Sequence, residues 1–413
     1  DDETAYRITV DGSGNAYIAG ETDSTTFPTR NPIQAQNAGD DDTFLVKLNT
    51  AGSPVYATYL GGNGIDYPYG LGVDAGGNVV MGGFTTSDNF PTLNAVDATK
   101  DTHADAFMAR INSAGSALTY STYLGGTFGD VVYDLVVDGA GNAYATGSTE
   151  SRNFPTTPGA YQVEGFFGAF VFKMSPGGSL VFSTYLGTAT DGTGIGIDPL
   201  GRIIVTGEAG SAFPLVNPTQ PVYGDNDDGF VSVLNASGSA LLFSTYIGGS
   251  GYDFGHGLAA DGSGAYIVGQ TTSHDFPLKN PFQTSAYGSG GIYDLWVAKF
   301  AFDDPAPAVQ GRTWYDDGSS LKGGPAATTI RVYGTGAVPG TAYRLVLARG
   351  DNLRRCADNV VTLSGTNRTA SAAGFIGATI GTIPTGTPPG QYHICFKATT
   401  GATVMSPVLF NVS

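Results

Sequence analysis

Through the first three quarters of the chain, short apolar runs are separated by Gly-rich turns. In one stretch, residues 69–73 alternate apolar and small residues, 74–78 form a Gly-rich turn and 79–84 are again apolar. Two further apolar runs follow at 105–111 and 118–124. Runs of this length, with tight turns between them and no apolar pattern of helical period, predict four antiparallel strands.

This four-strand pattern recurs at a fixed interval. A turn aspartate occurs at Asp11, Asp74, Asp138, Asp198 and Asp261, and a Phe-Pro pair begins at Phe27, Phe90, Phe154, Phe213 and Phe276. Both series have a period of about 60 residues, which is typical of repeat architectures. Four-stranded antiparallel units repeated around an axis make a β-propeller. We therefore expect an all-β protein with a five-bladed propeller at residues 1–302.

The strand that ends each repeat occurs only four times. It lies at residues 55–62, 118–126, 181–187 and 242–249. The fifth repeat ends with its third strand, formed by Asp294, Leu295, Trp296, Val297, Ala298, Lys299 and Phe300. A bare strand edge is a template for another strand. We expect a three-stranded blade, a strand supplied by the C-terminal domain, or a strand donated by another subunit; an N-terminal strand lost from the chain is a further alternative.

The repeats resemble a known bacterial family, the SBBP repeats, which are expected to form β-propellers. The resemblance rests on the hairpin Gly-Asn-x-Tyr at 14–17, the Phe-Pro-Thr loop at 90–92, the strand at 105–111 and Tyr-Ser-Thr-Tyr-Leu-Gly-Gly at 120–126. It covers about residues 1–302 and implies the fold, but little about activity. The family name presumes seven blades, so a fragment of a larger ring is the alternative to five.

Beyond residue 302 the repeat markers end. Residues 303–309 read as a linker, and 310–413 contain short β-like runs between Gly and Pro turns, which predict an immunoglobulin-like sandwich. Cys356 and Cys395 both lie in this region, and we expect them to form a disulfide rather than two reduced thiols. A disulfide implies an oxidising compartment, so the protein is expected to be secreted, extracellular or at the cell surface.

The net charge of the chain limits the kinds of partner that it can bind. The net charge is −17, from 36 acidic and 19 basic residues. Nucleic-acid phosphates are bound by clustered Lys and Arg, so a nucleic-acid partner is excluded and an anionic membrane surface is disfavoured. No apolar run approaches the roughly 18 residues that a spanning helix needs, so we expect no membrane insertion.

The repeats carry acidic groups at matching positions. Glu3, Asp66, Asp130 and Asp253 lie eight residues before the turn aspartates, and Asp191 lies seven before. A ring of carboxylates could hold a cation or serve a glycosidase, but equivalent groups in equivalent turns favour structural hydrogen bonds. Calcium is a minority alternative at the turn aspartates and at the acidic loops 40–42 and 225–228. We predict no cofactor and no metal.

Three residues break the repeat where the innermost strands should line a channel. These candidate channel residues are Arg7, Asp134 and His256. No nucleophile or second carboxylate accompanies them, so a salt-bridged plug is favoured over a catalytic set.

The patterns together predict a non-enzymatic structural or interaction protein, assembling with copies of itself or with another surface protein. The alternative is a carbohydrate-binding propeller, in which aromatic residues near the Phe-Pro loops stack on sugars. A glycoside hydrolase-like enzyme comes third.

Overall fold

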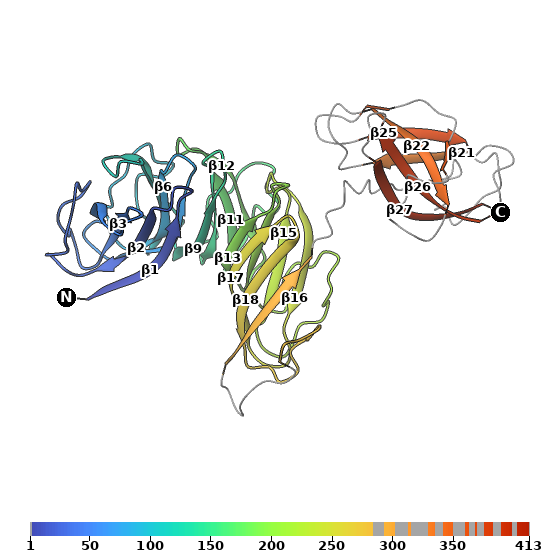
Figure 1. Ribbon diagram of the computed structural model, residues 1–413. Coiled ribbons are helices and arrows are strands. Elements are labelled where there is room, and N and C mark those ends of the chain that lie inside the picture. The colour runs from blue at the N-terminus through green and yellow to red at the C-terminus, as the bar shows by residue number, and fades with distance from the viewer. Residues whose placement is uncertain are drawn as a thin grey trace. The chain divides into compact units, whose positions relative to one another are not determined.

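The computed structural model describes residues 2–283 and 293–301 in full, and beyond them only the backbone of strands β20 to β27 (Figure 1). Every regular element in the described residues is a β-strand. Consequently none of the described residues forms a helix that could cross a membrane. The chain divides into two units, Asp1–Ala301 and Phe302–Ser413.

The first unit consists of five antiparallel sheets in chain order. Four sheets have four strands each, β1–β4, β5–β8, β9–β12 and β13–β16, and the fifth has the three strands β17–β19. The strands are β1 Glu3–Val10, β2 Ala16–Thr22, β3 Asp42–Leu48, β4 Pro54–Leu60, β5 Asp66–Val73, β6 Val79–Thr85, β7 Asp105–Ile111, β8 Leu118–Leu124, β9 Asp130–Val137, β10 Ala143–Thr149, β11 Gly168–Met174, β12 Leu180–Leu186, β13 Thr190–Ile197, β14 Ile203–Ala209, β15 Asp228–Leu234, β16 Leu241–Ile247, β17 Asp253–Asp261, β18 Gly264–Thr271 and β19 Asp294–Phe300. Repeated four-stranded antiparallel sheets are the architecture of a propeller.

The turn aspartate closes the first hairpin of each repeat. Oδ1 of Asp11 accepts hydrogen bonds from the backbone N–H groups of Ser13 and Asn15, both at 2.9 Å. Gly14 in the same turn has a φ of 82°, a conformation that glycine adopts without steric cost. Asp74 and Asp138 make the same pair of backbone hydrogen bonds. The aspartates are therefore Asx-turn residues, as predicted.

The Phe-Pro rings lie in the core of the sheets. Phe90, Phe154 and Phe213 are buried. Each ring contacts a phenylalanine of the third strand of its own repeat, and Phe154 stacks on Phe170 with ring centroids 4.5 Å apart. The backbone N–H of Phe154 also donates to the buried hydroxyl of Tyr185 on β12. These rings therefore anchor the Phe-Pro loops in the core of the sheets.

Neighbouring sheets pack through their innermost strands. Strand β5 contacts β1, β9 contacts β5, β13 contacts β9 and β17 contacts β13. Among the described strands, β17 does not pack against β1 in this way, and the two lie at opposite ends of the series (Figure 1). The predicted closure of five blades into a ring is therefore not confirmed.

In the second unit the described strands form two sheets. One has the order β20-β21-β25, and the other has β23-β22-β26-β27 with β24 also paired to β22. The strands are β20 Thr313–Trp314, β21 Thr329–Gly334, β22 Ala342–Arg349, β23 Val360–Thr362, β24 Arg368–Thr369, β25 Ile376–Thr382, β26 Gly390–Ala398 and β27 Thr403–Val412. The predicted linker at 303–309 and Cys356 lie outside the described residues, and of Cys395 only the backbone is described. The immunoglobulin-like sandwich and the disulfide stay predictions.

Candidate functional site

The fifth sheet leaves uncovered a face that is covered in every other sheet. The fourth residue of the third strand is fully buried in the first four sheets, where it is Leu45, Met108, Val171 and Val231. In β19 this residue is Val297, which is 72% exposed, and Leu295 two positions earlier is 75% exposed. The sequence of β19 is as apolar as that of its counterparts. The difference in exposure therefore reflects what lies next to the strand, since no further sheet follows the fifth among the described strands of this unit.

The neighbour that covers this face elsewhere is the next sheet. Oγ1 of Thr43 on β3 donates to the carbonyl oxygen of Asp66 on β5 at 2.9 Å. On the adjacent strand β2, Tyr17 is fully buried and its hydroxyl lies 3.5 Å from the carbonyl oxygen of Gly77 in the following repeat. The corresponding residues of β18, Tyr266 and Val268, are exposed. We call Tyr266, Val268, Leu295 and Val297 the end face.

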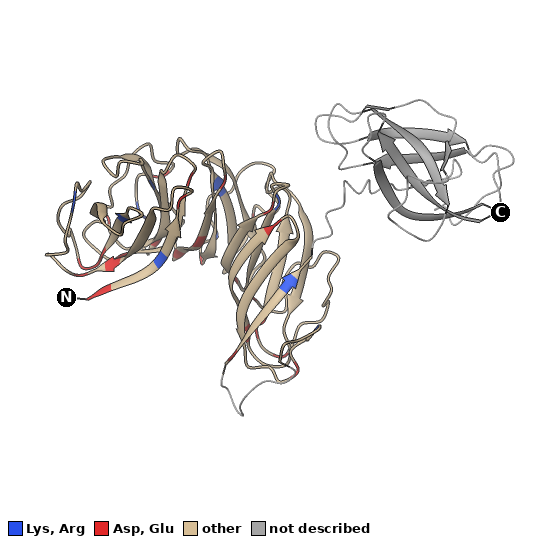
Figure 2. Ribbon diagram, viewed as in Figure 1, with Lys and Arg blue, Asp and Glu red and all other residues tan. Residues whose placement is uncertain are grey.

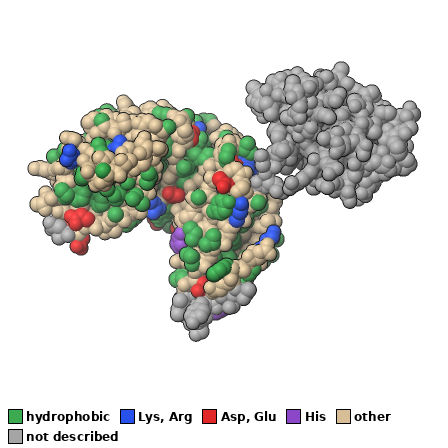
Figure 3. Space-filling model, viewed as in Figure 1, with side chains coloured by type: hydrophobic (Ala, Val, Ile, Leu, Met, Phe, Trp, Pro, Cys, Tyr) green, Lys and Arg blue, Asp and Glu red, His purple; other side chains and the backbone are tan. Residues whose placement is uncertain are grey.

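The first sheet has a matching uncovered face on its opposite side. Ile8 and Val10 on β1 are 68% and 58% exposed. The residues equivalent to Ile8 on β5, β9 and β13 are Leu71, Leu135 and Ile195, all buried against the preceding sheet. We call Ile8 and Val10 the first face, and Figure 3 shows hydrophobic side chains gathered over this first sheet. The two faces are the opposite halves of one repeated interface between sheets.

Strand β19 is the edge of its sheet in the described part of the chain. Its inward side chain, Trp296, stacks on Phe276 and donates its indole N–H to the carbonyl oxygen of Gln270 at 3.1 Å. Nζ of Lys299 is held by the hydroxyls of Ser263 and Tyr266, at 2.8 and 2.9 Å. The predicted edge is thus an ordered strand, anchored through Trp296 on one side and carrying Leu295, Val297 and Lys299 on the other.

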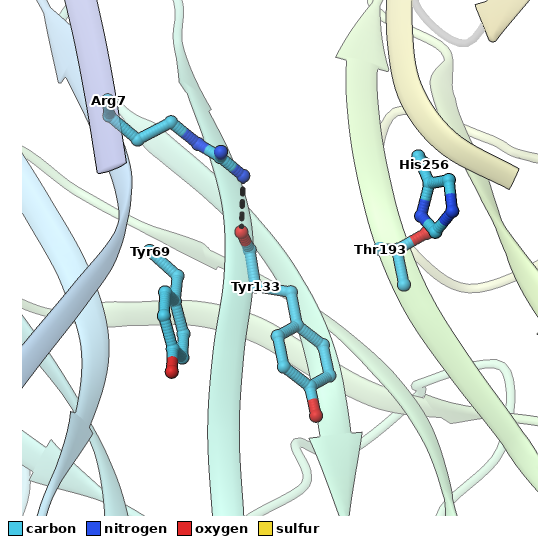
Figure 4. A pocket seen from close by; sticks show the side chains of 5 residues that line it. All are labelled: Arg7, Tyr69, Tyr133, Thr193 and His256. Carbon is cyan, nitrogen blue, oxygen red and sulfur yellow. Dashed lines mark hydrogen bonds between the residues drawn. The ribbon is translucent and has the colours of Figure 1, made fainter. Parts of the chain in front are cut away.

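A hollow of about 350 Å³ lies where the innermost strands meet. Its lining consists of Arg7, Tyr69, Tyr133, Thr193 and His256, one residue from each of β1, β5, β9, β13 and β17 (Figure 4). Nη2 of Arg7 donates to the carbonyl oxygen of Tyr133 at 3.1 Å. We call these five residues the inner hollow.

The predicted channel residues come together only in part. Arg7 and His256 line the inner hollow, whereas Asp134 lies beside it and accepts a hydrogen bond from the backbone N–H of Ile195 at 3.0 Å. Burial raises the pKa of Asp134 to about 6, and the nearby charge of Arg7 opposes this rise. The ion pairs of the described residues lie elsewhere, for example between Arg110 and Asp74, so the predicted salt-bridged plug does not form.

Beside the inner hollow lies a cluster that the sequence analysis missed. Tyr67, Tyr69 and Phe84 contact one another, with ring centroids 5.2 to 6.3 Å apart, and Tyr6 joins Tyr69 at 5.2 Å. The residues lie on three different strands and meet only through the pairing of β5 with β6 and the contact of β1 with β5. Their break from the repeat pattern was the available signal, because Tyr67 and Phe84 align with Val131 and Ser148 in the next repeat.

On the fourth sheet the same two positions carry carboxyl groups. Asp191 on β13 and Glu208 on β14 are cross-strand partners, so their carboxyl groups are neighbours. Burial and the neighbouring Asp191 carboxylate raise the pKa of Glu208 to about 7. The pair lies near Tyr133, whose pKa is raised by burial and by both acids.

The repeated acidic residues have structural roles. Asp66, Asp130 and Asp253 are buried, and Oδ2 of each accepts hydrogen bonds from a glycine N–H and from a serine hydroxyl. Within the described residues, no group of three or more His, Cys, Asp or Glu side chains is placed to hold a metal ion. Lys and Arg side chains are scattered singly in Figure 2 rather than gathered into a basic patch.

Comparisons with known proteins address the fold. A family model described as a beta-propeller repeat matches residues 1–28, 119–155 and 242–277. The first segment lies in the first repeat, and each of the other two runs from the last strand of one repeat into the next. No curated protein matches the chain. Two of the solved structures that align are a fungal alcohol oxidase of the AA5 family in complex with copper (11% identity, 100% of both chains, TM-score 0.19) and a gluconolactonase of Xanthomonas campestris (13% identity, 65% of this chain and 95% of that one, TM-score 0.23). Likenesses this weak say nothing about the activity of this chain.

Proposed function

We propose that this chain is a non-enzymatic structural protein of the cell surface or extracellular space, which assembles with other copies of itself through its end sheets. The observation that carries the proposal is the exposure of Leu295 and Val297 on β19, where four equivalent strands bury the matching residues. Covering a leucine or valine side chain contributes about 1.5–3 kcal/mol. A face built like a protein interior favours a partner that resembles the next sheet.

A second copy offers such a partner. In the second, third and fourth sheets, the face equivalent to Ile8 and Val10 packs against the preceding sheet. The first face of one chain therefore has the same form as the surface that covers each sheet inside the chain. Packing it on the end face of another chain would repeat the interface already used between sheets inside each chain. Because the two faces differ, the contact is heterologous and leads to a closed ring of several chains or to a filament.

Analytical ultracentrifugation of the full chain at increasing concentration tests this proposal. We expect concentration-dependent oligomers for the wild type and monomers for the double variant Leu295→Asp, Val297→Asp. The matched control is Val181→Asp, because Val181 is an exposed valine on the outer strand β12, away from both faces. Monomeric wild-type protein at all concentrations, or oligomers that survive the double variant, would contradict the proposal.

The carbohydrate alternative needs a different location from the one first expected. Phe90, Phe154 and Phe213 at the Phe-Pro loops are buried against third-strand rings, so their faces are already occupied. Sugar stacking would have to use aromatic residues elsewhere in the sheets.

A further inference from the structure

We infer that the inner hollow, together with the aromatic cluster and the carboxyl pair beside it, is a binding site for a neutral glycan chain. This site is separate from the end face and goes beyond the proposed assembly. Its side chains come from strands of all five sheets, and they lie together around the place where the innermost strands meet. None of the residues that form it is fully buried.

The aromatic half of the site is continuous. Tyr69 contacts Tyr6, Phe84 and Tyr133, with ring centroids 5.2, 5.8 and 6.1 Å apart. Figure 4 shows the rings of Tyr69 and Tyr133 beside each other with their hydroxyls pointing the same way. Half-buried rings of this kind offer apolar faces to the C–H groups of a sugar, as well as hydroxyls to its polar groups.

The polar half of the site consists of groups that bond to hydroxyls. The hydroxyl of Ser148 lies 3.5 Å from that of Tyr133. The neighbouring carboxyl groups of Asp191 and Glu208 offer several acceptor oxygens, which suit the hydroxyls of a ligand. Thr193 and His256, which lie across the hollow from Tyr69 in Figure 4, add further hydrogen-bonding groups.

The fold does not require these side chains. The positions of Asp191 and Glu208 carry Tyr67 and Phe84 in the second repeat and Val131 and Ser148 in the third. The sheets pair in the same register in each case, so acidic residues are not needed to build the hairpin. An aromatic pair in one sheet and an acidic pair in another, both next to residues that line one hollow, are therefore better explained by a ligand than by packing.

The charges favour a neutral ligand. Arg7 at the hollow would repel a cation, whereas the carboxyl groups of Asp191 and Glu208 would repel an anion. A glycan avoids both conflicts because its hydroxyls donate to carboxylates and accept from a guanidinium.

Isothermal titration of the full chain with the hexasaccharides of glucose (β-1,4 and α-1,4), xylose and N-acetylglucosamine tests the inference. We expect at least one to bind, with affinity at least tenfold weaker in Tyr69→Ala and in the near-isosteric double variant Asp191→Asn, Glu208→Gln. Thermal melting shows whether each variant is folded. The controls Tyr266→Ala and Asp88→Asn, at exposed residues outside the hollow, should bind like the wild type.

Failure of all four sugars to bind the folded wild type, or binding that both variants leave intact, would overturn the inference. Tetramethylammonium chloride is the cationic probe, and its binding at the hollow in place of the sugars would also overturn it. The double variant Leu295→Asp, Val297→Asp should keep its sugar affinity. Loss of assembly and loss of sugar binding are thereby separate results.

Discussion

Strands β7 and β19 are third strands of equivalent repeats, yet their surroundings differ. Every residue of β7 is buried, whereas β19 alternates between covered and exposed residues. Their sequences, Asp-Ala-Phe-Met-Ala-Arg-Ile and Asp-Leu-Trp-Val-Ala-Lys-Phe, are similarly apolar. One face of each third strand is buried within its own repeat. The other face of the strand is buried only where a following sheet covers it.

Placing the same charge at equivalent positions of a covered and an uncovered third strand tests this difference most directly. Val231→Asp puts a carboxylate into a fully buried position of β15, which we expect to cost about 3–5 kcal/mol of unfolding free energy. Val297→Asp puts it on the exposed end face, where a change within about 0.5 kcal/mol is expected under monomeric conditions. Urea denaturation measures both, and equal losses would show that the end face is covered in solution.

The interfaces between covered sheets should respond to pH. Burial, opposed by hydrogen bonds and assisted by a second aspartate nearby, raises the pKa of Asp42 and Asp105 to about 7 and that of Asp228 to about 6. Because these folded-state values exceed those of the unfolded chain, the folded state binds more protons between about pH 4 and 7. Stability should therefore be greatest at the acidic end of this window and fall as the pH rises.

The slope approaches about 1.4 kcal/mol per pH unit for each such group. Asp42→Asn should flatten the dependence of the urea midpoint on pH, while Asp88→Asn, at an exposed residue, should leave it unchanged. A midpoint that rises from pH 5 to pH 8 would contradict this sign. Turn hydrogen bonds lower the pKa values of Asp11 and Asp74. These two residues therefore reduce stability as the pH falls, but only at more acidic pH than this window.

A smaller effect should come from the hydroxyl that links the fourth strand to the Phe-Pro loop. The hydroxyl of Tyr185 accepts from the N–H of Phe154 at 3.0 Å and donates to the carbonyl oxygen of Ser151 at 2.8 Å. Tyr185→Phe leaves these buried groups unpaired, at a cost of about 2 kcal/mol. Tyr252→Phe, at an exposed tyrosine, is the control and should change thermal stability little. Equal stability of both variants would show that the hydrogen bonds of the Tyr185 hydroxyl do not stabilise the sheet.

Much of the local structure could be predicted from the chain. The strands expected at 105–111 and 118–124 coincide with β7 and β8, because apolar runs between Gly-rich turns have few other conformations. Strand β5 begins at Asp66, three residues earlier than expected, since Asp66 and Pro68 interrupt the apolar pattern at its start. For the inner hollow, adjacent positions of the repeat, four and five residues before the turn aspartate, placed Arg7 and His256 together in advance.

The rest of the site depended on contacts between strands. Tyr67 and Phe84, like Asp191 and Glu208, become neighbours only through strand register, and the aromatic and acidic halves meet only through the packing of successive sheets. The sequence by itself determined the repeats, the turns and, in the part of the chain that the structure describes, the three-stranded last sheet. Only the tertiary structure decided which sheet faces are covered, because burial between sheets depends on the neighbouring sheet and not on the strand that is buried.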